Sequence, residues 1–347
     1  MNLSERKAQI LSAVAEYYIA TGEPVGSKYL AEALPFTVSS ATIRNEMAEL
    51  SVIGLLEQPH TSAGRIPSDQ GLRYYAEHLL TPDSPTPNEI FRLLSGVDHT
   101  QGDPEIILSQ AAELLADLTG MAGVVTTPSA RDAAITNVQV VPVGTHAALV
   151  LLTTSVGAYR SRIANLPDGA GFGTLETFYN AAAANFIGVR CAAVNKAMLQ
   201  TVTLRLGERA LSIAPLLTSL YDAVCESTSS AAIIRGQRRL LKTALRPDAA
   251  AIIELTADPQ RLMRLLRRDS DEGVRLSIGR ENGAACLQNA SIVTLPYRSG
   301  AAGGVIGVLG PARMDYAHVI ALLRFAAAVT GDLIASATAH TDAGAYK

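Results

Sequence analysis

The sequence contains no tryptophan, only three cysteines and no surplus of positive charge. The cysteines, Cys191, Cys225 and Cys286, are too few and too scattered for a disulfide framework or a zinc site. No run of about 18 uninterrupted apolar residues occurs, which argues against a membrane-spanning helix. The first seven residues are polar and lack the apolar core of a secretion signal. These absences favour a cytoplasmic protein that does not act at a membrane.

The chain is long and apolar enough to fold into several domains. It has 347 residues, of which 48% are hydrophobic and 18% are charged, so it is too apolar for a disordered protein. A single core stops growing at about 250–300 residues, which predicts more than one domain. The net charge is −3, and residues 1–80 alone carry six basic and nine acidic groups, again −3. Any binding of nucleic acid must therefore rest on a small local surface.

Residues 1–80 have the order of a winged helix-turn-helix domain. Apolar residues at helical spacing, with serine caps and glycine stops, predict four helices. The helices are expected over residues 4–22, 28–34, 39–53 and 68–80. Two short extended segments, residues 55–58 and 65–66, enclose a polar loop between the third and fourth helices. Three-helix bundles with a hairpin also arise for other reasons, so the order alone leaves a role in DNA binding open.

The third predicted helix separates an apolar face from a face that suits DNA. Ile43, Met47 and Leu50 share one side and are expected to pack inward. On the opposite side and at the helix start lie the expected DNA contacts, which are Ser39, Ser40, Thr42, Arg44 and Asn45. Arginine can bond guanine in a bidentate manner, asparagine can bond adenine, and a helix start can bind a phosphate. For an isolated helix, an ordinary solvated face is the simpler interpretation.

The polar loop adds further candidates for DNA contact. His60, Thr61, Ser62 and Arg65 surround its tip, so the loop can follow a phosphate backbone or enter the minor groove. Lys28, Ser39, Thr61, Ser62 and Arg65 are expected mainly to position the backbone, whereas His60 can contact either bases or backbone. The alternative is an ordinary hairpin turn.

Beyond this region the sequence predicts an α+β domain interrupted by a helical block. Three prolines within eight residues indicate a linker at its start. The expected divisions are a linker over residues 81–102, a first part over 103–172, an inserted, mostly helical domain over 173–272, and a second part over 273–347. Strands before and after the helical block indicate one sheet built from both parts.

Five motifs resemble the family of heat-inducible transcription repressors called HrcA. Near the N-terminus these are TGEPVGS at residues 21–27, ATIRNEMAEL at 41–50 and LEQPHTSAGRIP at 56–67. Toward the C-terminus they are VRLSIGREN at 274–282 and GVLGPARMDY at 307–316. The third motif is twelve consecutive residues with little degeneracy, so the resemblance is specific, and it spans most of the chain.

The resemblance implies a bacterial repressor of class I heat-shock operons, which encode the major chaperones. It implies a homodimer that binds double-stranded DNA at an inverted-repeat operator, CIRCE, with the chaperonin GroEL as positive modulator. It also implies a winged-helix domain and a GAF-like domain into which a dimerising domain is inserted. No cofactor, metal or catalysis is implied. The chain departs from the family pattern at residues 233–237 and at Ala312, so the dimer geometry is not carried over.

Two other functions were left open by the sequence. One is a winged-helix repressor whose GAF-like domain senses a small metabolite. The other is an enzyme that uses the glycine-rich segment at residues 303–310. A dinucleotide-binding loop needs a strand, a glycine turn and a helix, whereas these glycines lie within an expected strand that packs closely on its neighbours. The six histidines show no paired helical spacing, so no metal site is expected.

Overall fold

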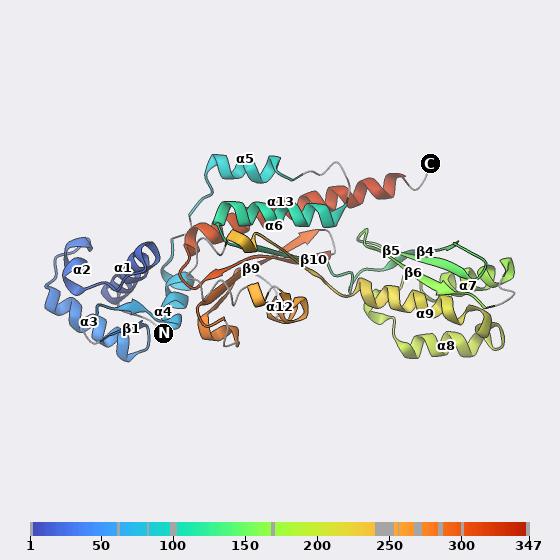
Figure 1. Ribbon diagram of the computed structural model, residues 1–347, viewed down its shortest axis with the longest axis horizontal. Helices are drawn as coiled ribbons and strands as arrows, with labels where there is room; N and C mark the ends of the chain where they lie inside the picture. Colours follow the sequence, from blue (N-terminus) through green and yellow to red (C-terminus); the bar gives the residue numbers. More distant parts are fainter. Residues whose placement is uncertain are drawn as a thin grey trace.

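The fold was analysed in a computed structural model. It describes residues 3–60, 63–81, 83–97, 103–167, 171–239, 253–255, 257–266, 273–283, 287–299 and 302–344. The molecule is elongated and has three parts, an N-terminal unit and a distal unit at opposite ends of a central unit (Figure 1). It is an α+β protein with several antiparallel sheets.

The N-terminal unit contains the predicted helices and a short strand pair. Its elements are α1 (Glu5–Thr21), α2 (Ser27–Ala33), α3 (Ser40–Val52), β1 (Leu56–Glu57), β2 (Ile66–Pro67) and α4 (Asp69–Tyr74), which continues as a π-helical turn (Tyr75–Leu79). The side chains of Ser4, Ser39 and Ser68 accept hydrogen bonds from backbone amides at the helix starts, as the sequence predicted. Gly22, with φ of 79°, ends α1 in the left-handed conformation.

The segment expected to be a linker contains a helix. Helix α5 (Pro87–Ser95) begins with Pro87 in its first turn, where the missing amide costs no hydrogen bond. Thr86 and Glu89 form a reciprocal capping box. Leu93 and Val97 are buried in the core of the central unit. The prolines therefore precede a packed helix, which occupies residues 87–95 of the segment expected to be a linker over residues 81–102.

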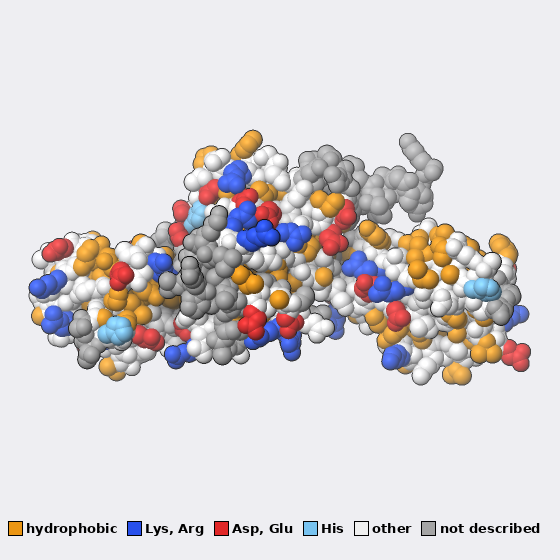
Figure 2. Space-filling view, viewed as in Figure 1, with side chains coloured by type: hydrophobic (Ala, Val, Ile, Leu, Met, Phe, Trp, Pro, Cys, Tyr) orange, Lys and Arg blue, Asp and Glu red, His pale blue; other side chains and the backbone are white. Residues whose placement is uncertain are grey.

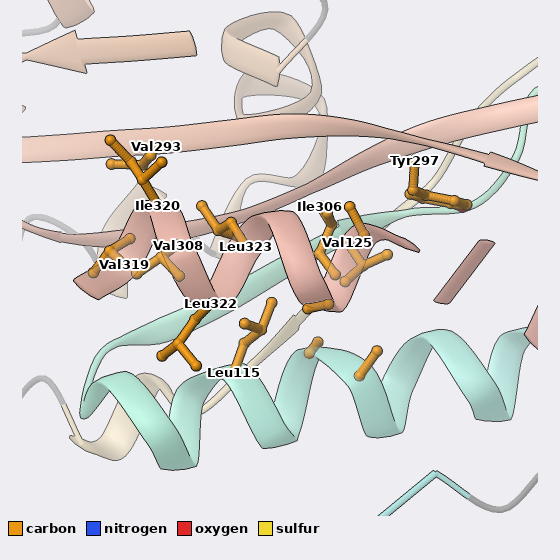
Figure 3. Close-up of a cluster of buried hydrophobic side chains, with 14 of the residues drawn as sticks. Leu115, Val125, Val293, Tyr297, Ile306, Val308, Val319, Ile320, Leu322 and Leu323 are labelled. Carbon is orange, nitrogen blue, oxygen red and sulfur yellow. The ribbon is translucent and has the colours of Figure 1, made fainter. Parts of the chain in front are cut away.

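The central unit is a five-stranded antiparallel sheet with helices on both faces. The strands are β3 (Ala122–Thr126), β7 (Ala232–Arg235), β8 (Arg275–Ile278), β9 (Ala290–Ser299) and β10 (Ala302–Pro311), in the order β7-β3-β10-β9-β8. Helices α6 (Pro104–Thr119) and α13 (Tyr316–Gly344) cover one face, and α12 (Pro259–Leu266) covers the other (Figure 1). Figure 3 shows the core between the sheet, α6 and α13, where Leu322 of α13 lies toward Leu115 of α6 and Leu323 lies toward the strands.

Helix α13 is long and apolar enough to cross a membrane by length and composition alone. Over Tyr316–Ser336 its mean hydropathy is 1.7, and 56% of that stretch is buried within the protein. The sequence criterion of an uninterrupted apolar run missed it because Arg324 and Asp332 interrupt the run. Its apolar side packs against β9, β10 and α6, so its hydropathy is explained by its place in the core.

Strand β10 contains the glycine-rich segment. Gly304 and Gly307 lie in the middle of the strand, where an added Cβ would meet Tyr297 and the Val293 carbonyl within 2.6 Å. Residues 303–310 therefore form a strand that packs closely on β9, as expected, and not a phosphate-binding turn.

The distal unit has its own sheet and its own core. Its elements are β4 (Ile135–Pro142), β5 (Ala147–Thr154), β6 (Tyr159–Asn165), α7 (Phe172–Asn185), a 3₁₀ turn (Cys191–Ala193), α8 (Lys196–Leu206) and α9 (Arg209–Ser227). The sheet order is β4-β5-β6, and its buried face packs against α9 and α7.

Sheet pairing divides this part of the chain at positions other than the expected residues 173 and 272. Among the described strands, β4 to β6 pair only with one another, and they share a core with α7 to α9, so they belong with the helical block. Strand β7, within the expected helical block, pairs with β3 in the central sheet. The alternation of apolar residues predicts that a segment is a strand, but it does not specify the strand's partner.

Candidate nucleic-acid interface

Helix α3 presents two different faces, as its sequence predicts. Ile43, Met47 and Leu50 are buried in the core of the N-terminal unit. Arg44 and Asn45 are exposed on the opposite side. Neither has a hydrogen-bond or ion-pair partner within the described part of the chain. Their donors and acceptors are thus available to a ligand outside the protein.

The start of α3 is held by Ser39. Its Oγ accepts a hydrogen bond from the backbone amide of Thr42 at 3.1 Å and lies 2.9 Å from Thr42 Oγ1. The two hydroxyls are therefore paired with each other, and Ser39 is the residue that caps the helix. Ser40, half-buried, is the first helical residue. The cap orients this turn and leaves Arg44 and Asn45 projecting one turn further along.

A buried carboxylate fixes α3 against α1. Glu46 is only 7% exposed, and its Oε1 accepts a hydrogen bond from Nε of Arg6 at 2.9 Å. Lys7 Nζ lies 2.6 Å from Glu49 Oε2 and 3.9 Å from Glu46 Oε2. The hydrogen bond between Lys7 and Glu49 raises the pKa of Lys7 and lowers the pKa of Glu49. Sequence reasoning missed this cluster, although a glutamate three residues after Ile43 on the buried face was its signal.

Ion pairing sorts the cations of the N-terminal unit into two groups. Arg6, Lys7 and Arg73 form ion pairs with glutamates. The other three basic residues of residues 1–80 have no acidic partner among the described residues. They are Lys28, Arg44 and Arg65. All three are among the DNA contacts that the sequence predicts. Figure 2 shows some basic side chains, which it does not identify, at the outer end of this unit.

The loop between β1 and β2 is held at its base. Arg65 Nη1 donates to Gln58 Oε1 at 2.7 Å, and Gln58 Nε2 donates to the Ala63 carbonyl at 3.0 Å. His60 is exposed at the tip, and Arg65 is half-buried. The predicted contacts Thr61 and Ser62 lie outside the described residues. The base of the loop is thus ordered by polar contacts, with one histidine projecting from it.

The same loop is attached to the turn between α1 and α2. The backbone amides and carbonyls of Val25 and Arg65 exchange two hydrogen bonds of 2.9 Å. Gly64 makes this approach possible, because an added Cβ would collide with the Val25 carbonyl. Lys28 is exposed in the first turn of α2, close in sequence to this junction. The structure therefore connects α2, α3 and the loop into one unit, and Gly64 is a residue that sequence reasoning did not single out.

Such an arrangement suits a duplex better than a small ligand. An exposed arginine and asparagine on one helix offer the donors that read purine edges in a major groove. Lys28 and Arg65 of the same unit carry the positive charge that attracts phosphates. Among the described residues, no group of three or more His, Cys, Asp or Glu side chains is placed to hold a metal ion.

Known proteins resemble this chain along most of its length. The family model described as the C-terminal domain of HrcA protein matches residues 105–320. A heat-inducible transcription repressor HrcA of Moorella thermoacetica is 33% identical over 330 residues, which cover 93% of this chain and 96% of that protein. The protein of the same name from Xylella fastidiosa (strain M23) is 33% identical over 334 residues, with 95% of each chain covered.

A solved structure also shares the fold. A crystal structure described only as a hypothetical protein superposes with a TM-score of 0.61 and 24% sequence identity. It covers 97% of this chain and 100% of that chain. The likeness therefore extends over nearly the whole length of both chains.

Proposed function

The chain belongs to the HrcA family of heat-inducible transcription repressors and is not an enzyme, and from that premise we propose that it binds an inverted-repeat operator of the CIRCE type as a homodimer. Each N-terminal unit would occupy one half-site, so the two-fold symmetry of the dimer matches that of the operator. The operons controlled would be the class I heat-shock operons in the cytoplasm, as the family resemblance implies.

The observation that carries the proposal is the exposed face of α3. Arg44 and Asn45 project from it with no partner among the described residues, whereas Arg6 and Lys7 of the neighbouring α1 are paired with glutamates of α3. We assign the N-terminal unit as a winged helix, with α3 in the major groove and the loop of residues 58–65 as the wing. Thr42, Arg44, Asn45 and Ser40 would read bases, and His60 would contact bases or backbone.

We assign the backbone contacts to Lys28, Ser39, Thr61, Ser62 and Arg65. Lys28 and Arg65 provide the charge, and the hydroxyl groups provide hydrogen bonds to phosphate oxygens. Because the unit as a whole is acidic, these contacts are few, and specific affinity depends on two half-sites being bound together.

We assign dimerisation to the distal unit and a GAF-like fold to the central unit. The outer face of the distal sheet places Val141 and Ile163 on either side of Leu149 in one row across three strands. Ile163 is 67% exposed and Tyr159 on the same strand is 60% exposed. An exposed apolar row of this kind supports contact with a second copy.

GroEL, as the family resemblance implies, would keep the repressor active.

A mobility-shift titration tests the proposal. The purified full-length protein is titrated against the inverted repeat, a single half-site and a scrambled duplex at fixed salt, with and without chaperonin. We expect the inverted repeat to bind at least about 10²-fold more tightly than the half-site, because both units engage together. Equal affinity for the repeat and the scrambled duplex would overturn operator binding. Equal affinity for the repeat and the half-site would overturn binding as a dimer.

A further inference from the structure

The N-terminal unit is joined to the central unit by a polar contact between two distant motifs. Arg73, in α4, donates from Nε to Glu281 Oε1 at 2.6 Å and from Nη2 to the Leu276 carbonyl at 2.7 Å. Its Nη2 also pairs with Glu281 Oε2. The hydrogen bond to Glu281 raises the pKa of Arg73 above its ordinary value. One guanidinium thus binds both the side chain and the backbone of the central unit in a fixed fork geometry.

A second contact lies beside the first and needs a glycine. The backbone amide of Arg280 donates to Asp69 Oδ2 at 3.0 Å. Gly279 has φ of 57°, and an added Cβ would collide with the Asp69 carboxylate. The start of α4 therefore lies directly against the turn of residues 279–282. Asp69 and Arg73 lie four residues apart on one face of α4. Asp69 binds the Arg280 amide, and Arg73 binds Glu281 and the Leu276 carbonyl.

Apolar packing at this joint is confined to one side. Leu72 and Ala76 are buried with Leu276 and Ile278 in the core of the central unit. The polar contacts, in contrast, border two hollows of about 470 and 320 Å³. Both hollows border the face of α4 that carries Asp69, Arg73 and Glu77, so on this face polar contacts and not close packing join the two units. The ion pair and the Asp69 hydrogen bond act there together with a hydrogen bond from Arg313 to the Ile19 carbonyl near the end of α1.

Any rotation of α4 is transmitted to the DNA-reading face. Pro67 ends β2 and Asp69 begins α4, so only the capping residue Ser68 separates them. The Ser68 hydroxyl also donates to the Gly54 carbonyl just beyond α3, at 2.5 Å. Helix α3, the strand pair and α4 are therefore joined directly to one another. The joint sets the direction of α3 relative to the central unit.

We propose that Arg73 and Glu281 are positioning residues that determine which spacing between operator half-sites the repressor accepts. This inference rests on the proposed binding of an inverted repeat by a dimer. In such a dimer the separation and relative rotation of the two α3 helices depend on the angle at each joint. A fixed angle gives one preferred spacing, and a loosened angle lets the same dimer adapt to several.

The test compares operators in which the spacing between half-sites is changed by one or two base pairs. Two base pairs rotate one half-site by about 70° relative to the other. For the unaltered protein we expect on the order of 10²-fold weaker binding at this spacing, because both units can no longer engage together. For Glu281→Gln, which keeps the size but loses the charge, we expect less than about a tenfold loss, with unchanged half-site affinity. Gly279→Ala acts on the neighbouring contact and is expected to broaden or shift the preferred spacing.

Glu113→Gln is the matched control, because it removes one of the two carboxylates that pair with Arg239 within the central unit and leaves the joint intact. It should keep the spacing profile of the unaltered protein. Identical spacing profiles for the unaltered protein, Glu281→Gln and Gly279→Ala would overturn the inference while the proposed function stands. If the unaltered protein bound the repeat no better than a half-site, the proposed dimeric binding would itself fail, and this inference with it.

Discussion

Arg6, in the first turn of α1, and Glu46, on the buried side of α3, form an ion pair that connects the start of one helix to the middle of another. The Nε–Oε1 distance is 2.9 Å, and Glu46 is 7% exposed whereas the Arg6 side chain is 51% exposed. For a carboxylate so poorly hydrated, the hydrogen bond from its partner offsets part of the lost contact with water. The pair therefore determines how α3, with its exposed Arg44 and Asn45, is held.

Replacing Arg6 with alanine should destabilise the N-terminal unit by about 1 kcal/mol, a value at the low end because Arg6 is half exposed. The loss arises mainly from leaving the Glu46 carboxylate without its hydrogen bond. Urea unfolding of the full-length protein measures the change. The double variant Arg6→Ala/Glu46→Gln should recover part of the loss, since a neutral amide is less costly to leave in place. Equal stability of the unaltered protein and Arg6→Ala would show that the ion pair does not contribute to the free energy of unfolding.

Arg44→Ala should weaken operator binding by roughly 1–3 kcal/mol and relax base preference at one position in each half-site. The physical reason is the loss of a bidentate contact to a purine edge. Binding to a set of operators mutated at single positions measures both effects. Arg324→Ala, which removes an exposed arginine of α13, is the control and should change neither. If Arg44→Ala weakened binding to every operator equally, Arg44 would be a phosphate contact and not a base reader.

Gly64→Ala should weaken operator binding through the position of the wing. The new Cβ would collide with the Val25 carbonyl, so the two hydrogen bonds between Val25 and Arg65 would lengthen or break. Overpacking of this kind costs about 1–3 kcal/mol. Thermal unfolding and operator titration measure the two consequences. Gly144→Ala is the matched control, because nothing lies within 4 Å of its added Cβ, and it should leave both quantities unchanged.

Local structure in the N-terminal unit could be predicted because its signals are local. Ser4, Ser39 and Ser68 cap helices within three residues of their own position. The exposed face of α3 also follows from helical spacing, and so do Arg44 and Asn45 as candidates. The role of Glu46 was not predicted, since it depends on Arg6, 40 positions earlier in the chain.

Features that depend on distant pairing escaped prediction. Strands β4 to β6 were recognised as strands, but their separate sheet was not, because the choice of partner is made by packing across the whole chain. Arg73 and Glu281 lie 208 positions apart. Each looks like an ordinary surface charge in the sequence, and only the fold brings them together. Helix α5 was not predicted because prolines usually end a helix, whereas Pro87 lies in the first turn of this one.

Arg65→Ala should weaken binding to operator and random duplex by a similar factor and should reduce the salt dependence of binding. Each phosphate contact contributes about 0.9 to the slope of log affinity against log salt concentration. Only Lys28, Arg44 and Arg65 lack an acidic partner among the described residues of the N-terminal unit. The slope of the unaltered protein should therefore be small, and the loss of one contact per unit should be easy to measure. Gln58→Ala separates charge from loop position, because it removes the hydrogen bond to Arg65 and keeps the cation. An unchanged slope for Gln58→Ala and a reduced one for Arg65→Ala would identify a phosphate contact, whereas equal reductions would mean that Arg65 acts only by holding the loop.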